Sequence, residues 1–333
     1  MDKAGDPVLS IVVLTHNRHG LLRDCLRSLA AQQDPLGTIE LVVADDGSTD
    51  DTAAVVAAFE RDHGSVIYAR QPHKGIPAAR NLGIRHARGA IVAIVADDYL
   101  LAPDYARTVI GFFENHPRAE VVRFRIVAAR HDLVSRLSHL RYEVAFRNRL
   151  HHVGRATRDL SKLRRYLGRP RAEMQEVTTD HDLEAAGAAA FRSSVFERVG
   201  LFDEDLPSGE DTDYAERLKA AGIDIYYDPF HPVRHQYVDG ALAALRSCFL
   251  QGISQCRIHR KSGQRTSAGR KAAAVIRGLV GPFAQGIWGA RQVEGAKESF
   301  LFLPAWLVSE FTVKLGFCWG FLTDRWRPGA PRL

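Results

Sequence analysis

The chain has 333 residues, of which 46% are hydrophobic and 25% are charged, and its formal net charge is +6. This composition excludes a mainly disordered protein and gives enough length for one large domain or two smaller ones. The positive charge permits nucleic acid, acidic lipid headgroups or a phosphorylated substrate as partners, without choosing among them. The four cysteines show no CxxC spacing and no apolar segment precedes the first strand, so we expect a reducing cytoplasm.

The N-terminal region has the pattern of a strand, a helix and a second strand. Apolar runs at 8–14 and 39–44 predict buried strands, and leucines at helical spacing predict a helix over 20–33 between them. A right-handed crossover places the ends of both strands on one edge of a parallel sheet. That edge therefore receives the polar residues that follow each strand.

The segment DDGSTDDT after the second strand has two interpretations. One of the residues Ser48, Thr49 and Asp50 caps the next helix, which is a common role for these residue types. In addition, Asp45 and Asp46 are well placed to accept hydrogen bonds from a ribose or from a base N–H. The local pattern alone leaves both interpretations open.

A third strand at 66–70 leads to Lys74 and Gly75 and then to a helix that carries Arg80. Helix N-termini and cations both favour phosphate, although a solvated helix residue is the alternative for Arg80. A fourth buried strand, at 91–95, ends in Asp97 and Asp98. These carboxylates either cap the next helix or bind a ligand. The repeated strand and helix pattern predicts a doubly wound α/β domain.

The chain changes character at 130–171, where twelve Arg or Lys residues stand against three Asp or Glu residues. This insertion is either a solvated helical lid or a surface that contacts a phosphorylated acceptor or anionic headgroups. Small residues from Gly187 to Ala190 then allow close backbone packing. Glu210 and Asp211 open a helix, either as an acidic cap or with a general base among them. His231 or His235, after a strand at 223–227, could meet a metal.

Five collinear stretches together resemble the family 2 glycosyltransferases with the A-type nucleotide-sugar fold. They are SIVVLTHNR, ELVVADDGSTDDT, KGIPAARNLGIRHARG with VADDYLLAPD, GAAAFRSSVFERVGLFDEDL, and GEDTDYAERLKAAG with the later VRHQ. The resemblance covers roughly residues 8–238 without the basic insertion. It implies a GT-A type, Rossmann-like, doubly wound and mostly parallel sheet, with a basic helical insertion and a C-terminal helical region that associates with membranes.

The resemblance also implies roles for individual residues. The donor-binding positions it implies are Leu14, Thr15, His16, Asn17, Asp46, Lys74, Arg80 and Asp97. Asp46 resembles the reader of the base, and Arg80 resembles a residue that orients the acidic motif or touches the diphosphate. Asp98 resembles the last carboxylate of a D-x-D motif, which binds Mg²⁺ or Mn²⁺. His235 resembles the histidine that completes this metal site. Asp211 resembles the catalytic base, with Gly187, Ala188 and Glu210 on the acceptor side. The chain departs from the motif at Ala96, which stands where its first Asp often lies.

The C-terminal third predicts an amphipathic helix after residue 238, a basic helical region at 264–291 and an apolar, aromatic-rich segment at 300–326. Pro304, Glu310 and Lys314 disfavour a membrane span, so we expect a helix in the membrane interface. Its expected anchors are the aromatic residues Trp306, Phe311, Phe317, Trp319 and Trp326. Packing onto the catalytic domain or onto a second subunit is the alternative. The expected regions are a donor-binding half (1–129), the basic insertion (130–180), a catalytic-base half (181–238) and the C-terminal helices (239–333).

The resemblance implies an inverting, metal-dependent transfer of a sugar from a nucleoside-diphosphate sugar. UDP is the most frequent nucleotide in the resembled family, and GDP and dTDP are the alternatives. The expected acceptor is a hydroxyl group of a glycolipid or cell-envelope polysaccharide precursor. We expect peripheral attachment to the inner face of the cell membrane, with its anionic surface as a partner. We expect no binding of nucleic acid, and a homodimer is compatible with the sequence. The alternatives are a nucleotidyltransferase on a related sheet, whose Gly-rich phosphate loop is missing near the N-terminus, and a basic lipid- or nucleic-acid-binding module without catalysis.

Overall fold

The computed structural model describes residues 7–33, 39–129, 178–180, 187–206, 209–236, 240–261 and 296–323, with a few isolated positions between them. The chain forms two compact units, one of residues 1–129 with 174–237 and one of residues 130–173 with 238–333. Apart from residues 178–180 and isolated positions, the predicted basic insertion and the basic region at 264–291 lie outside the described residues.

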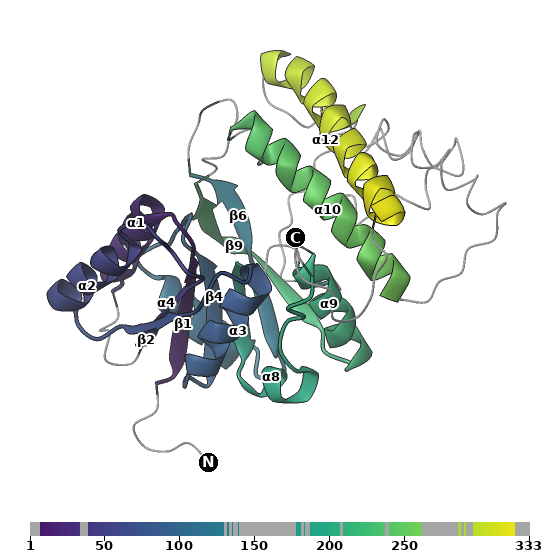
Figure 1. Ribbon diagram of the computed structural model, residues 1–333. Coiled ribbons are helices and arrows are strands. Elements are labelled where there is room, and N and C mark those ends of the chain that lie inside the picture. Colours follow the sequence, from purple (N-terminus) through teal and green to yellow (C-terminus); the bar gives the residue numbers. More distant parts are fainter. Residues whose placement is uncertain are drawn as a thin grey trace. The chain divides into compact units, whose positions relative to one another are not determined.

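The first unit is a mixed α/β structure built on one nine-stranded sheet (Figure 1). Its N-terminal half runs β1 (Leu9–Thr15), α1 (His19–Ala30), β2 (Ile39–Asp45), α2 (Thr52–His63), β3 (Ile67–Arg70), α3 (Ile76–His86), β4 (Ile91–Ala96), β5 (Tyr99–Leu100), α4 (Tyr105–Asn115) and β6 (Val121–Ala128). Its second half runs β7 (Thr178–Asp180), β8 (Ala188–Arg192), α8 (Ser194–Val199), α9 (Glu210–Ala220) and β9 (Ile225–His235). The predicted α/β class is confirmed.

The sheet has the order β3-β2-β1-β4-β8-β6-β9-β5, and β7 pairs with β9. Strands β1 to β4 pair with one another in parallel, whereas β8 runs antiparallel between β4 and β6. In this register Val95 faces Ala188, and Tyr99 of β5 faces His235. The carboxyl ends of β1, β2, β4 and β9 and the start of β8 therefore share one edge of the sheet.

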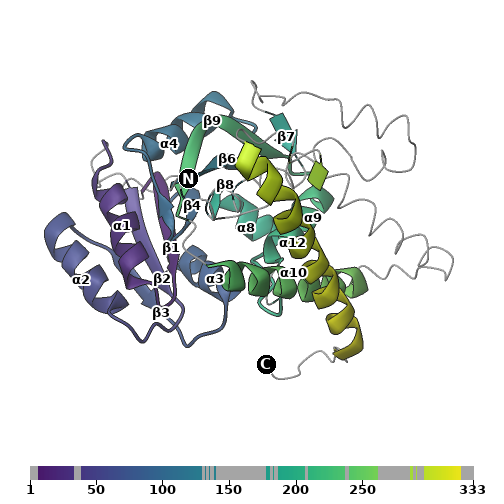
Figure 2. The ribbon, with the colours of Figure 1, turned by 90° about the horizontal axis from the view of Figure 1, so that it is seen from above.

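Both faces of this sheet are covered, so the side chains that alternate along each parallel strand are buried on either side. Val12, Leu14, Val42 and Ile94 belong to a hydrophobic core that also contains residues of α3, α8 and α9. The helices α1 and α2 lie on the other side of the strands, as a right-handed crossover requires (Figure 2). Burial on both faces explains why these strands read as continuous apolar runs, since neither set of side chains meets water.

Strand β9 is longer than the predicted strand at 223–227, because it continues to His235. Its pairing with β6 shifts register between Phe124 and Ile126, where the partners jump from Asp228 to Val233. Pro229 and Pro232 lie in this irregular stretch. Proline has no backbone N–H to donate to a neighbouring strand, and this is tolerated where the strand pairing is interrupted. The extension brings His235 to the edge that carries the polar strand ends.

The second unit contains the helices α10 (Ala241–Lys261) and α12 (Ala296–Thr323), which pack against each other. Gly252 and Gly316 allow this close approach, since a Cβ atom at either would lie 2.0 Å from a carbonyl oxygen of the other helix. Within α12, Phe300–Gly320 is long and apolar enough to cross a membrane by length and composition. Trp306, one of the aromatic residues expected as membrane anchors, is instead buried.

Candidate active site

The polar edge of the sheet is centred on Asp97 and Asp98, directly after β4. The Asp97 backbone N–H continues the pairing with β1 by donating to the Leu14 carbonyl oxygen at 3.0 Å. The Thr15 hydroxyl at the end of β1 donates to Asp97 Oδ2 at 2.8 Å. Strand pairing therefore holds the Asp97 carboxylate beside the first polar tip.

Arg18 and His235 contribute positive or hydrogen-bonding groups to this pair. Arg18 Nη1 donates to Asp98 Oδ2 at 3.0 Å and lies 3.6 Å from Asp97 Oδ1. His235 Nε2 lies 3.4 Å from Asp98 Oδ2, and its ring meets the Tyr99 ring edge-on. Sequence reasoning missed Arg18, although it follows directly on the predicted tip from Leu14 to Asn17.

The two carboxylates have opposite pKa shifts. Burial raises the pKa of Asp97 to about 7, and the adjacent negative charge of Asp98 adds to this effect against Arg18 and Thr15. Burial also acts to raise the pKa of Asp98, but the hydrogen bond and charge of His235 and the charge of Arg18 outweigh it and hold the pKa below its usual value. Asp98 is thus the carboxylate that these neighbours keep ionised.

Asp98 Oδ1 is buried and has no hydrogen-bond partner among the described residues. An ionised oxygen in this state is costly unless a cation or a donor satisfies it. Carboxylate oxygens suit Mg²⁺ and Mn²⁺, and the imidazole of His235 is a further ligand type for a first-row metal. The donor set around Asp98 therefore fits a divalent cation.

The Asp46 carboxylate is bound by the loop that follows β3. It accepts hydrogen bonds from the backbone N–H groups of Lys74 at 2.9 Å and Gly75 at 2.7 Å, and from Gln71 Nε2 at 2.7 Å. His73 Nδ1 lies 2.8 Å from Asp46 Oδ2. The carboxylate predicted to read a base thus also fixes the start of α3, and the exposed Lys74 side chain projects from the same loop.

Asn17 joins the first and second polar tips. Its φ of 53° lies in the left-handed region, which Asn adopts more readily than most residues. Its Oδ1 accepts from the Thr49 backbone N–H at 2.7 Å, and its own N–H donates to the Ser48 hydroxyl at 2.9 Å. The preceding residue, His16, stacks on His73 with ring centroids 4.1 Å apart. The two tips and the loop after β3 therefore form one surface.

Arg80 and Glu210 form a buried ion pair that links α3 to the first residue of α9. The Arg80 guanidinium also lies over the Phe202 ring, 5.1 Å from its centroid. The two predicted roles for Arg80, orienting the acidic motif or touching diphosphate, both stay predictions. Sequence periodicity does not reveal a partner 130 positions away.

Asp211 is half-buried beside the buried Glu210, and its Oδ1 accepts the Thr212 backbone N–H at 2.8 Å. Because Glu210 is bound by Arg80, Asp211 is the more accessible carboxylate at the start of α9. Gly187 and Ala188 lie where β8 begins, and a Cβ atom at Gly187 would lie 3.3 Å from the Tyr99 ring. The small residues predicted for the acceptor side therefore lie next to the chain segment that carries Asp98.

Breaking the Arg80 pair tests its structural importance. We expect Arg80→Met to lower the free energy of unfolding by about 3–5 kcal/mol, because Glu210 would keep a buried charge without its partner. Urea denaturation measures this value. Arg85→Met is the control, since Arg85 lies on the same helix and makes a half-exposed pair with Glu204 at 3.7 Å, worth about 0–1 kcal/mol. Equal losses in both variants would show that the buried pair has no special role.

Comparison with known proteins places these motifs among sugar-transferring enzymes. The model of the family described as Glycosyl transferase family 2 matches residues 10–200. Validoxylamine A glucosyltransferase of Streptomyces hygroscopicus subsp. jinggangensis (strain 5008) is 38% identical over 118 residues, which are 35% of this chain and 28% of that protein. The chain thus matches about a quarter of the length of that relative.

Two solved structures share the fold at low sequence identity. The mannosyltransferase PcManGT from Pyrobaculum calidifontis, in complex with GDP-Man and Mn²⁺, aligns with a TM-score of 0.58 and 17% identity, covering 96% of this chain and 88% of that one. Residues 1–349 of S. aureus TarS align with a TM-score of 0.52 and 16% identity, covering 96% and 93%. These likenesses concern the arrangement of the chain.

Proposed function

The chain belongs to glycosyl transferase family 2, and we propose from this premise that it moves a sugar from a nucleoside-diphosphate sugar to a hydroxyl acceptor with inversion. The observation that carries the proposal is the pair formed by the buried Asp97 and the partly buried Asp98 at the carboxyl edge of the sheet. Ligands of open α/β sheets bind outside this edge. Asp98 has an oxygen there that no described residue satisfies.

The donor nucleotide is proposed to bind along the tips of β1 and β2. Leu14 to Asn17 and Asp46 would contact the base and ribose, and the cationic side chain of Lys74 would face the phosphates. UDP is the proposed nucleotide. Because Asn17 already bridges the two tips, this surface is organised before the donor arrives.

Asp98 and His235 would hold the divalent cation, with Asp97 beside it towards the donor. A bound Mg²⁺ or Mn²⁺ supplies Lewis-acid stabilisation of the negative charge on the departing nucleoside diphosphate. Neighbouring side chains fix the orientation of the Asp97 and Asp98 carboxylates. Thr15 orients Asp97, and Arg18 holds Asp98 from the β1 side.

Asp211 is proposed as the general base that takes the proton from the acceptor hydroxyl while its oxygen attacks the anomeric carbon. The C–O bond to the acceptor forms as the bond to the diphosphate breaks, so the configuration inverts. A carboxylate is a weak base, which suffices if proton transfer is late. The proposed acceptor is a glycolipid or cell-envelope polysaccharide precursor.

A panel of nucleotide sugars tests the proposal. The purified chain is incubated with each donor and Mn²⁺, and release of nucleoside diphosphate and thermal shift are followed. We expect at least one donor to stabilise the protein and to be consumed when a hydroxyl acceptor is present. If no donor raises the melting temperature and none is hydrolysed or transferred, the transferase proposal fails, and a nucleotidyltransferase or binding module takes its place.

The apolar stripe of α12 supports peripheral attachment to the inner face of the cell membrane. The exposed side chains of this stripe are Phe300, Val308, Phe311, Leu315 and Trp319, with Phe311 62% and Trp319 55% accessible. Their spacings of eight, three, four and four residues place them along one side of the helix. Exposed apolar side chains of a helix that lies on a membrane insert at the headgroup boundary.

Two added charges should release the protein from membranes. We expect Phe311→Asp with Trp319→Asp to lower binding to phosphatidylglycerol and phosphatidylcholine vesicles at least about tenfold, since burying each side chain contributes about 1.5–3 kcal/mol. Co-sedimentation measures the bound fraction. Ala54→Asp with Ala57→Asp is the control, because it adds the same charge at exposed positions of α2. Unchanged binding of the α12 variant would refute the membrane role of this stripe.

A further inference from the structure

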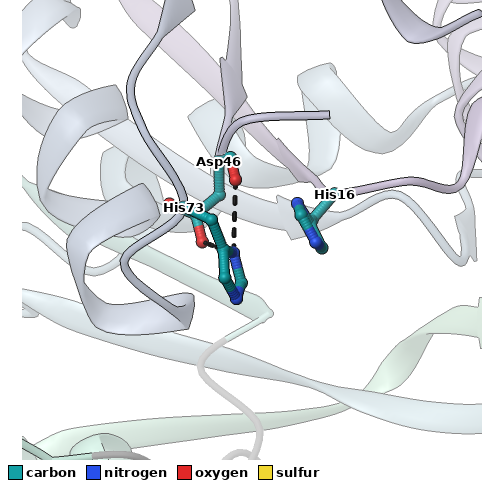
Figure 3. Close-up of side chains that lie close together, drawn as sticks. All are labelled: His16, Asp46 and His73. Carbon is teal, nitrogen blue, oxygen red and sulfur yellow. Dashed lines mark hydrogen bonds and ion pairs between the residues drawn. The ribbon is translucent and has the colours of Figure 1, made fainter. Parts of the chain in front are cut away.

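A second cluster of metal-ligating side chains lies at the tips of β1, β2 and β3 and shares no residue with the Asp98 site. His16 follows β1, Asp46 follows β2 and His73 follows β3, and their ligand atoms all lie within 4.8 Å of one another. Figure 3 shows both imidazole rings beside the Asp46 carboxylate. Three separate segments thus supply two nitrogen ligands and one oxygen ligand to one point.

Asp46 is fixed before any ligand binds. Its carboxylate is 4% exposed and is held by two backbone N–H groups and by Gln71 Nε2. The remaining contact is with His73 Nδ1, 2.8 Å from Oδ2. A cation held between His73 and Asp46 in place of this contact would keep the charge of Asp46 satisfied.

His16 provides a nitrogen that the fold leaves unsatisfied. Its Nδ1 is buried and has no hydrogen-bond partner among the described residues, whereas its Nε2 lies 3.2 Å from Asn17 Nδ2. A buried polar atom without a partner costs free energy that a bound cation would recover. The unsatisfied nitrogen is therefore an independent indication of a missing ligand.

The rings need only a small rearrangement to converge on one ion. They are stacked with an interplanar angle of 20° and ring centroids 4.1 Å apart. Ligands of a tetrahedral Zn²⁺ at about 2.0–2.1 Å lie about 3.3 Å apart, so ligand atoms up to 4.8 Å apart must close by about 1.5 Å at most. The His73 side chain is 61% exposed and has room to rotate by this amount.

We propose that His16, Asp46 and His73 bind a borderline transition-metal ion such as Zn²⁺ or Co²⁺, with water in the fourth position. Two imidazoles and one carboxylate are a ligand set that such ions favour, whereas Mg²⁺ prefers oxygen ligands throughout. The site would select a different ion from that expected at Asp98. The proposal concerns binding of the metal alone and does not depend on the proposed transferase activity.

His231 offers a matched control within the same unit. Its Nδ1 lies 2.8 Å from Asp228 Oδ2, the distance found for His73 and Asp46, and its side chain is 52% exposed. Among the residues that the structure describes, this pair has no third ligand grouped with it. The His231 and Asp228 pair therefore resembles the His73 and Asp46 pair in its distance and exposure, but it has no counterpart of His16 in the described part of the chain.

Titration of the full chain with Co²⁺, without nucleotide, tests the proposal through the visible absorption of four-coordinate Co²⁺. We expect a saturable band that Zn²⁺ displaces. His73→Ala should weaken this binding by roughly 100-fold or more, because loss of even an outer-shell partner costs about 10–100-fold. His16→Phe, which keeps a ring on His73 but removes the nitrogen, should have a similar effect. His231→Ala should leave the affinity within about twofold.

The proposal is overturned if the wild-type chain gives no four-coordinate band, if His73→Ala and His16→Phe bind Co²⁺ as the wild type does, or if His231→Ala weakens binding equally. Circular dichroism establishes that each variant is folded. Because no donor is present, a failure of the proposed transferase activity leaves the titration unchanged, and loss of the Co²⁺ band leaves the transferase proposal untouched.

Discussion

Asp98→Asn should lower the rate of sugar transfer by on the order of 10²–10³-fold, the loss typical for removal of one preorganised charge-stabilising group. The substitution keeps the size of the side chain but removes the negative charge that Arg18 and His235 surround. It would leave the Arg18 guanidinium without its anion and weaken the hold on the cation. Release of nucleoside diphosphate at saturating donor, and at a Mn²⁺ concentration that just saturates the wild type, measures the effect.

Asp104→Asn is the matched control for this variant. Asp104 lies six residues further along the chain, is exposed, and makes no side-chain cap hydrogen bond at the start of α4. We expect its activity to stay within about twofold of the wild type. Raising the Mn²⁺ concentration should recover part of the activity of Asp98→Asn, since a weakened metal site fills at higher metal. Full activity of Asp98→Asn at low Mn²⁺ would remove Asp98 from the metal site.

The placement of polar residues at one sheet edge was predictable, because it depends only on the direction in which the strands run. Buried apolar runs before Thr15, Asp45 and Asp97 predict parallel strands, and parallel strands joined by right-handed crossovers end at the same edge. The strand β8 was not predicted, since its run from Gly187 is made of small residues. Small residues indicate close packing without specifying whether the chain there is a strand or a turn.

Contacts between distant segments were not predictable from local patterns. Arg18 meets Asp98 across 80 positions, and His73 meets Asp46 across 27 positions. Only the resemblance to a family indicated that His235 joins the Asp98 site, because Pro229 and Pro232 interrupt the strand pattern before it. Irregular pairing of β9 with β6 explains how these prolines are accommodated. The role of the basic insertion at 130–180 stays a prediction.

Asp211→Asn should lower kcat by about 10²–10⁴-fold, the range that a positioned general base contributes, while donor affinity stays unchanged. The structure gives a reason to choose Asp211 over its neighbour. Glu210 is buried and bound by Arg80, whereas Asp211 is half-buried at the first turn of α9. Asparagine keeps the acceptor for the Thr212 backbone N–H, so the start of the helix should be preserved.

Asp213→Asn separates loss of the base from loss of acidic charge at the start of α9. Asp213 lies two residues further on and pairs with Arg217 on the same helix at 3.0 Å, a contact worth about 0.3–0.5 kcal/mol. Both substitutions remove one negative charge from the same turn, so an electrostatic effect of the helix end would lower both rates alike. A general base predicts that only Asp211→Asn loses kcat while thermal shift with donor stays at the wild-type value. Equal activities of the two variants would assign proton removal to another group.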